Sequence, residues 1–221
     1  MALGRLSDLQ ERVLVLLAGI RPAWTLTGGG ALAGFHTLHR ETRDLDLFFR
    51  GEHTLGPVVD AVRAQLVHGG MTVAVLRTSS MFSQLDVRDD LGAVVVDLVA
   101  DPTPIAESPV ATKLGDTTIL VDSPHQLFVN KLCALLGRSE LRDLVDVREL
   151  LARGADLGRG LEDCPRQDGG FSPLTFAWSV RGLRLDVLGA ALGLTPEVIA
   201  ELESFRDELV TRVIDASRPP A

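Results

Sequence analysis

The sequence has no long apolar run. No hydrophobic segment approaches the about 20 consecutive apolar residues that span a membrane, so no transmembrane helix is expected. The first 20 residues carry Asp8, Glu11 and Arg12 at helical spacing, with Ser7 in position to cap a helix. They therefore predict an amphipathic helix and not a signal peptide. We expect a cytoplasmic protein with no membrane association.

The sequence is also poor in cysteine and in positive charge. Its two cysteines, Cys133 and Cys164, lack metal-site spacing and suggest no disulfide framework. A net charge of −8 argues against broad, charge-driven binding of nucleic acid, and leaves a local basic groove as the alternative. At 221 residues and 46% hydrophobic, the chain can form one large domain or two small ones. No internal repeats are present.

Lysine is the scarcest charged residue. Of 22 basic residues, only Lys113 and Lys131 are lysines, and Lys131 lies in the apolar segment "LFVNKLCALL". In an arginine-rich chain, such a lysine indicates a place where a compact ammonium fits and a guanidinium does not. A lysine at a helix edge whose ammonium reaches solvent is the alternative.

The hydrophobic pattern divides the chain into two parts. Residues 1–122 alternate between expected strands and helices, and residues 123–221 are expected to be helical. The expected strands are a short one at 24–27 and longer ones at 43–49, 72–78, 82–88, 93–101 and 117–122. The expected helices cover about 30–39, 54–70, 123–138, 139–154, 172–183, 185–192 and 195–215, with a glycine-rich linker at about 154–170. We predict an α+β domain at residues 1–122 followed by a helical domain at residues 123–221.

Two aspartates head one of these strands. In a strand, Asp44 and Asp46 share one face while Leu45 and Leu47 share the other. Two like charges repel, and burying them without a partner is costly. The apolar residues that follow predict a buried central strand, at whose mouth carboxylates are natural ligands for Mg²⁺. Solvated acids at a strand edge are the alternative.

A third carboxylate lies in another apolar strand. Asp97 shares a face with Val95 and Val99, and buried unpaired aspartate is rare. If its strand neighbours that of Asp44 and Asp46, the three acids are stable together only around cations. Asp86 is a rival to Asp97 as the third carboxylate. Asp101, which follows in the same segment, is expected to be a solvated loop acid.

Glycines precede the first of these acids. Gly28, Gly29 and Gly30 lie between a strand and a helix, where backbone amides can approach a phosphate closely. A tight strand-to-helix turn is the alternative. The dinucleotide-binding pattern fits poorly, because the acids arrive 14 residues after Gly30 and as a pair.

A second helical motif follows Lys131. Arg142 and Asp146 stand at i and i+4, with Asp143 in the same turn. An ordinary surface ion pair between Arg142 and Asp146 is the alternative to a functional role.

In combination, these segments resemble the AbiEii/AbiGii-type nucleotidyltransferases of the polymerase-β-like superfamily. The resemblance covers about residues 24–151 and comprises a Gly-Gly helix start, an Arg-x-Ser/Thr-x-Asp-x-Asp strand, a lysine helix and an Arg-Asp-x-x-Asp helix. The matching residues after the glycines are Arg40, Thr42, Asp44 and Asp46, then Lys131, then Arg142, Asp143 and Asp146. One departure is Gly30, where the family often has Ser or Thr; Thr27 or backbone amides could substitute.

The resemblance implies a fold and a reaction. The fold is a mixed sheet with flanking helices, followed by the C-terminal helical domain, which would complete the active-site cleft. The reaction is metal-dependent transfer of a nucleoside monophosphate from an NTP to an acceptor, with release of pyrophosphate. Characterised relatives use the 3′ end of tRNA, and many are toxins of toxin–antitoxin or abortive-infection systems. We therefore expect NTP, tRNA and a cognate antitoxin as partners.

The resemblance also assigns roles to residues. Asp44, Asp46 and Asp97 would hold two Mg²⁺ ions, and Lys131 and Asp146 would complete the catalytic set. The nucleotide would contact Gly28, Gly29, Gly30, Arg40, Thr42, Lys131 and Asp143. Transfer to a small molecule such as an antibiotic, transfer to a protein hydroxyl, and a catalytically silent binding module all remain open. Residues 155–221 carry no recognisable motif.

Overall fold

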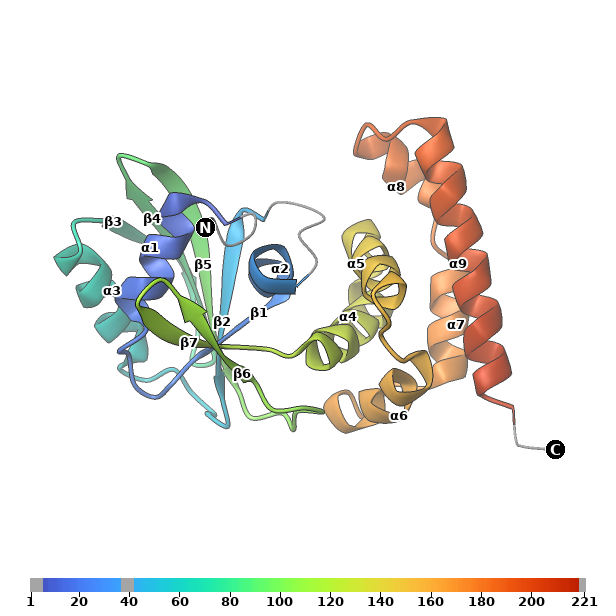
Figure 1. The fold of residues 1–221 in the computed structure, drawn as a ribbon, viewed down its shortest axis with the longest axis horizontal. Coiled ribbons are helices and arrows are strands. Elements are labelled where there is room, and N and C mark those ends of the chain that lie inside the picture. The colour runs from blue at the N-terminus through green and yellow to red at the C-terminus, as the bar shows by residue number, and fades with distance from the viewer. Residues whose placement is uncertain (1–5, 37–41, 219–221) are drawn as a thin grey trace. The chain divides into compact units, whose positions relative to one another are not determined.

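The computed structural model describes residues 6–36 and 42–218 of the chain. It divides the chain into two compact units, Met1–Ser123 and Pro124–Ala221. The first unit contains a seven-stranded mixed sheet with helices, and the second is built from helices α4 to α9 (Figure 1). The predicted α+β fold class is therefore confirmed. Within the described ranges, no helix is both long enough and apolar enough to cross a membrane.

The sheet has the order β3-β4-β5-β2-β1-β7-β6. Its parallel pairs are β2 with β5 and β1 with β7, and the other neighbours are antiparallel. In chain order the strands are β1 (Thr25–Thr27), β2 (Asp44–Arg50), β3 (Thr72–Thr78), β4 (Phe82–Asp89), β5 (Gly92–Asp101), β6 (Val110–Leu114) and β7 (Thr117–Val121). Strand β2 occupies the central position, as its apolar residues predicted.

Helices α1 and α3 pack against this sheet and against each other. Helix α1 (Asp8–Leu17) begins at Ser7, whose hydroxyl accepts from the backbone N–H of Gln10 while the Gln10 side chain accepts from the backbone N–H of Ser7. This reciprocal capping satisfies amide groups that a helix start would otherwise leave open. Helix α3 (Val58–His68) packs beside α1 (Figure 1).

The structure differs from the sequence prediction at two places in this unit. The expected helix at 30–39 is a short α2 (Gly28–Ala31) that continues as a π-helical turn, η1 (Leu32–His36). Its predicted last residues lie outside the described part of the chain. Strand β6 was not expected, because its few residues mix apolar and polar side chains without a clear period.

The second unit contains six helices in the part of the chain that the structure describes. They are α4 (Pro124–Arg138), α5 (Leu141–Ala152), α6 (Leu157–Gln167), α7 (Pro173–Arg181), α8 (Leu185–Ala191) and α9 (Pro196–Ala216). Helix α6 replaces the linker expected at 154–170. Asp156 caps it by accepting from the backbone N–H of Arg159, and its buried side includes Leu161 and Cys164.

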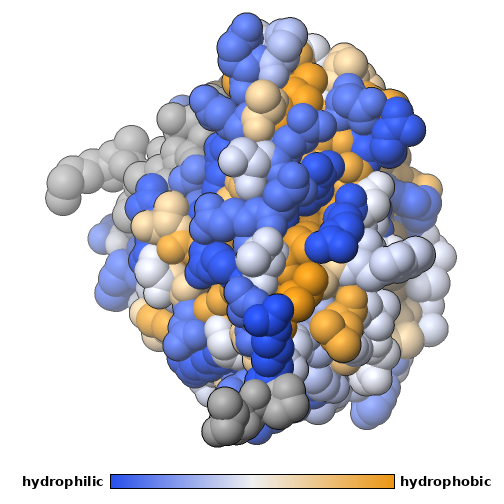
Figure 2. All heavy atoms as spheres, turned by 90° about the vertical axis from the view of Figure 1, so that its right-hand side faces the viewer, coloured by the Kyte–Doolittle hydropathy of each residue, from blue (hydrophilic) through white to orange (hydrophobic). Residues whose placement is uncertain are grey.

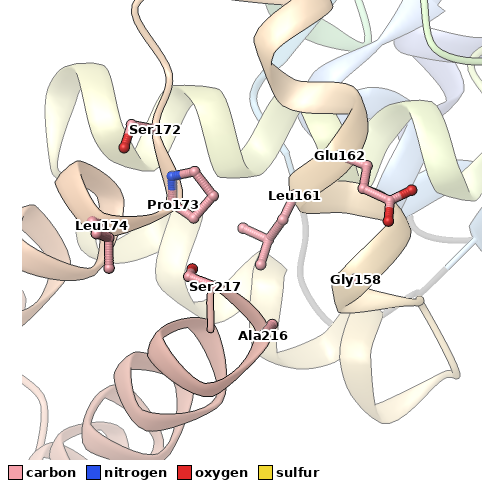
Figure 3. A pocket seen from close by; sticks show the side chains of 8 residues that line it. All are labelled: Gly158, Leu161, Glu162, Ser172, Pro173, Leu174, Ala216 and Ser217. Atoms are coloured by element: carbon pink, nitrogen blue, oxygen red, sulfur yellow. The ribbon is translucent and has the colours of Figure 1, made fainter. Parts of the chain in front are cut away.

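The surface of the second unit mixes charged and apolar side chains. Figure 2 shows hydrophobic atoms gathered in patches between the hydrophilic side chains of the C-terminal helices. The most exposed large apolar side chain is Trp178 on α7, with 78% of its surface accessible, and Leu174 lies one turn before it. A cavity of about 370 Å³ lies between α6, α7 and the end of α9 (Figure 3). No residue predicted for catalysis or nucleotide binding lines this cavity.

Candidate active site

Strand β2 separates its carboxylates from its leucines. Asp44 and Asp46 lie half-buried on one face, whereas Leu45 and Leu47 on the other face are fully buried. The alternation follows from the two-residue repeat of a strand. The carboxylates therefore share a face, as expected from the sequence.

Asp97 joins this face from the neighbouring strand. Strands β2 and β5 are parallel, and their register places Asp97 directly opposite Asp46. Asp44 lies one position away on the same face, opposite Val95. Burial raises the pKa of Asp97, and the negative charge of Asp44 raises it further, while Gln84 and Arg77 act in the opposite direction. The three predicted carboxylates are thus brought to one region of the sheet.

Each of these carboxylates has a close neighbour. The Thr42 hydroxyl donates to Asp44 Oδ1 at 2.5 Å, and the Gln84 side-chain amide donates to Asp97 Oδ1 at 2.9 Å. The Asp46 carboxylate lies against Gly28: a Cβ added there would overlap its Oδ2 and lie 2.8 Å from its Cγ. Gly28 also has φ of +61°, which L side chains rarely adopt. The close approach of Asp46 and the backbone conformation both require glycine at this position.

The donor set fits magnesium chemically. Carboxylate oxygens are the ligands that Mg²⁺ prefers, and a cation would relieve the repulsion that Asp44 exerts on Asp97. Among residues 6–36 and 42–218, however, no three His, Cys, Asp or Glu side chains already stand in an arrangement that would hold a metal ion. The hydrogen bonds from Thr42 and Gln84 each occupy one carboxylate oxygen, so a metal ion held here would use the other oxygens of Asp44 and Asp97, together with water or substrate oxygens.

The neighbouring glycine has a different environment. A Cβ on Gly30 would lie 3.1 Å from Leu26 Cδ1 and 3.2 Å from Leu45 Cδ2, tighter than an ordinary contact. Gly30 therefore lets the start of α2 pack closely on the sheet. Thr27, considered as a substitute for the missing hydroxyl, is buried opposite Asp46. Arg40 lies outside the described residues.

Lys131 is buried in a charged cluster of the second unit. Its Nζ lies 2.9 Å from Asp143 Oδ1 and 2.7 Å from Asp146 Oδ2, and neither aspartate side chain has accessible surface. Arg138 also binds Asp143, through Nε at 2.7 Å and Nη2 at 2.9 Å. The ammonium therefore does not reach solvent, and Asp146 is not part of a surface pair. The nearest acid to Arg142 is Glu140, at 2.6 Å.

The same cluster controls the ionisation of Asp143. Burial acts to raise the pKa of this carboxyl, but the hydrogen bonds and charges of Arg138 and Lys131 outweigh it. The net result is a pKa below the ordinary value, so Asp143 stays ionised well into the acidic range. The structure thus brings Lys131, Asp143 and Asp146 together within one unit.

Sequence reasoning missed a second charged group on the carboxylate face. Arg50, at the end of β2, donates to Asp101 and, through Nη2 at 2.7 Å, to the fully buried Asp122. Its guanidinium lies over the Phe48 ring, 4.9 Å from the centroid. Asp101, the possible solvated loop acid, is instead largely buried at the end of β5. Because side chains alternate along a strand, Arg50 lies on the same face as Asp46, and this spacing could have identified Arg50 from the sequence.

Solved structures of other proteins share this fold. The chain is similar to MenT4, a nucleotidyltransferase toxin of Mycobacterium tuberculosis H37Rv, with 20% identity, a TM-score of 0.62, and coverage of 94% of this chain and 82% of that one. It is also similar to JHP933 of Helicobacter pylori, with 16% identity, a TM-score of 0.57, and coverage of 95% and 92%. At these identities the likeness establishes the fold alone.

Sequence comparison is more specific. A search of curated protein sequences finds no significant match. A family profile described as "Nucleotidyl transferase AbiEii toxin, Type IV TA system" matches residues 12–210 and so spans most of both units. The chain therefore belongs to the AbiEii family of nucleotidyltransferase toxins of type IV toxin–antitoxin systems.

Proposed function

We propose that this nucleotidyltransferase moves a nucleoside monophosphate from an NTP to the 3′ end of tRNA in a magnesium-dependent reaction. Membership of the family implies an NTP substrate and an antitoxin; the metal and the tRNA acceptor are our proposal. The observation that supports it best is the register of β2 and β5, with Asp46 opposite Asp97 and Asp44 beside them on the same face. Clustered carboxylates of this kind are costly without a cation.

The proposed roles follow from the chemistry of phosphoryl transfer. Asp44, Asp46 and Asp97 would hold two Mg²⁺ ions, which when bound would neutralise charge on the triphosphate and polarise the attacking and leaving oxygens. Asp97 would accept the proton of the acceptor hydroxyl, a role that suits a carboxyl whose pKa is raised by burial. Charge build-up on the leaving pyrophosphate would be countered by Lys131.

The remaining contacts concern the nucleotide. We propose that the backbone amides of Gly28, Gly29 and Gly30 contact the phosphates, with Arg40 and Thr42 nearby. Asp143 and Asp146 would orient Lys131, a role supported by the two short distances to its ammonium. Lys131 must then give up part of these contacts, or share them, when the nucleotide is bound.

The test is a transfer assay with separated acceptors. Purified protein is incubated with Mg²⁺, each labelled NTP in turn, and separate pools of tRNA, protein and an aminoglycoside. We expect label in tRNA alone, and its loss when magnesium is chelated. Label in the protein or aminoglycoside pool would show that the acceptor is not tRNA. Label in none of the pools would indicate a catalytically silent binding module.

A matched pair of variants tests the carboxylates. Asp46→Asn should lower transfer by at least about 100-fold, because it removes one ionised oxygen ligand while keeping the size of the side chain. Asp86→Asn is the control, since Asp86 is half-buried on the same face but is bound to Arg88 at 2.8 Å. Equal activity of the two variants would remove Asp46 from the metal site.

A further inference from the structure

One row of side chains crosses five strands of the sheet. The registers place Arg77 of β3 opposite Gln84 of β4, Gln84 opposite Asp97 of β5, Asp97 opposite Asp46 of β2, and Asp46 opposite Thr27 of β1. Directly opposed residues of paired strands project from the same face. Arg77 and Gln84 therefore lie on the carboxylate face, although neither belongs to a motif of the sequence.

A β-bulge brings Arg77 onto this face. Val75 pairs with Leu85, but the next pair is Arg77 with Gln84, so that Leu76 is an extra residue in β3. Without this shift, Leu76 would stand opposite Gln84 and Arg77 would project from the other face. Bulges frequently re-aim a side chain next to an active site.

Hydrogen bonds connect this row from its exposed end to Asp97. Arg77 donates to Gln84 Oε1 through Nε at 3.2 Å and Nη2 at 2.9 Å, and Gln84 Nε2 donates to Asp97 Oδ1 at 2.9 Å. A guanidinium has only donors, and an ionised carboxylate has only acceptors. The orientation of the Gln84 amide is therefore fixed from both sides, and its N–H must face Asp97.

We propose that Arg77 and Gln84 are positioning residues that hold Asp97 in the orientation needed for metal binding. This inference rests on the proposed function. Gln84 restrains one carboxylate oxygen and leaves the other for a metal ion or the acceptor hydroxyl. Arg77 acts through Gln84, because its two hydrogen bonds stop the amide from turning its oxygen towards Asp97. Neighbours that orient a metal ligand by hydrogen bonding commonly affect metal affinity or activity by about 10- to 100-fold.

The surroundings support a restraining role for this pair. Arg77 is exposed, and an exposed arginine normally loses side-chain entropy when it is held in one conformation. Here the guanidinium is held by two hydrogen bonds and lies 5.9 Å from the centroid of the Phe82 ring.

Manganese binding tests this inference without catalysis. Mn²⁺ replaces Mg²⁺ as the probe, and its free concentration is followed by electron paramagnetic resonance with the full chain and no nucleotide. Gln84→Met keeps the side-chain volume and removes the donor, so we expect affinity to fall by about 10-fold or more. Arg77→Met should weaken binding less, and the double variant should bind like Gln84→Met alone.

This non-additivity separates a relay from two independent structural effects. Independent residues would give additive losses, whereas residues of one hydrogen-bonded chain do not. Arg88→Met is the matched control: Arg88 lies on β4 and binds a different carboxylate, Asp86, so its loss should leave Mn²⁺ affinity unchanged. In the transfer assay, Gln84→Met should raise the magnesium concentration that gives half-maximal activity, with little change in the KM for NTP.

Two results would overturn the inference, and they differ in what else they imply. If the wild-type chain binds Mn²⁺ and Asp46→Asn abolishes binding, but Gln84→Met and the control bind alike, only the positioning role fails. If the wild-type chain binds no Mn²⁺ and transfers without magnesium, the proposed metal site fails as well. Urea unfolding of each variant checks that the fold is retained.

Discussion

Replacing Lys131 by methionine should destabilise the protein strongly. The Lys131 ammonium lies within 2.9 Å of Asp143 and 2.7 Å of Asp146, and both carboxylates are fully buried. Methionine keeps most of the apolar packing but removes the charge. Removing one partner of a buried ion pair costs about 3–5 kcal/mol, because the remaining charge stays in a poorly solvated place. That is a large share of the about 5–15 kcal/mol that stabilises a typical protein.

The two carboxylates should not contribute equally to this loss. Asp143 keeps the two hydrogen bonds from Arg138, whereas Asp146 loses the cation at 2.7 Å. Adding Asp146→Leu to the methionine variant should therefore recover about 2 kcal/mol or more, since apolar replacement of buried ion pairs is often neutral. Lys131→Arg should also destabilise, by about 1–3 kcal/mol, because the larger guanidinium overfills a packed site.

Urea unfolding measures these differences, and the sequence supplies its own control. Lys113 is the other lysine of the chain and lies exposed on β6, so Lys113→Met should change the free energy of unfolding by no more than about 0.5 kcal/mol. If Lys131→Met cost no more than this control, the ammonium would not be the buried counter-ion of Asp143 and Asp146 in solution. Activity of Lys131 variants is informative only where the unfolding data show a folded protein.

Two further predictions concern glycine and acid. Gly28→Ala should lower the free energy of unfolding more than Gly51→Ala. Both glycines have positive φ, with a backbone penalty of about 1–2 kcal/mol for alanine, but only a methyl group added at Gly28 would overlap Asp46. Urea unfolding of the two variants measures the difference, and equal losses would contradict the close approach of Asp46. Because the pKa of Asp143 is lower in the folded protein than the ordinary value of 3.8, this carboxylate stabilises the fold at pH values above 3.8. The stabilisation is lost as the pH falls below 3.8, because the unfolded chain then binds more protons than the folded chain. Unfolding free energy measured between pH 5 and pH 3 should therefore fall less steeply in Asp143→Asn than in the wild type, and identical slopes would refute the assignment.

Much of the fold was accessible from local sequence patterns. The two-residue alternation from Asp44 to Phe49 predicted both faces of β2, and the capping residues around Ser7 predicted the start of α1. Both features depend on residues close in sequence. Helix α6 was missed because its glycines and Pro165 indicate a linker, and its buried side is recognised only when α4 packs against it.

The site was accessible only in part. The acid within an apolar strand indicated Asp97, but its position opposite Asp46 depends on the pairing of β2 with β5. Arg77 could not have been placed on the carboxylate face, because the bulge at Leu76 reverses the face that simple alternation predicts. From its own helix, Lys131 could be either a buried ammonium or a lysine that reaches solvent. It is buried because Asp143 and Asp146 of the next helix bind its ammonium.

The two tryptophans have an optical consequence. The chain has no tyrosine, so Trp24 in the first unit and Trp178 in the second dominate its near-ultraviolet absorption and emission. Trp24 is buried and donates to the Leu17 carbonyl at 2.7 Å, whereas Trp178 is 78% exposed. A red shift of the emission on denaturation therefore reports almost solely on the sheet-containing unit. Loss of the helical unit is nearly silent in fluorescence and has to be followed by circular dichroism.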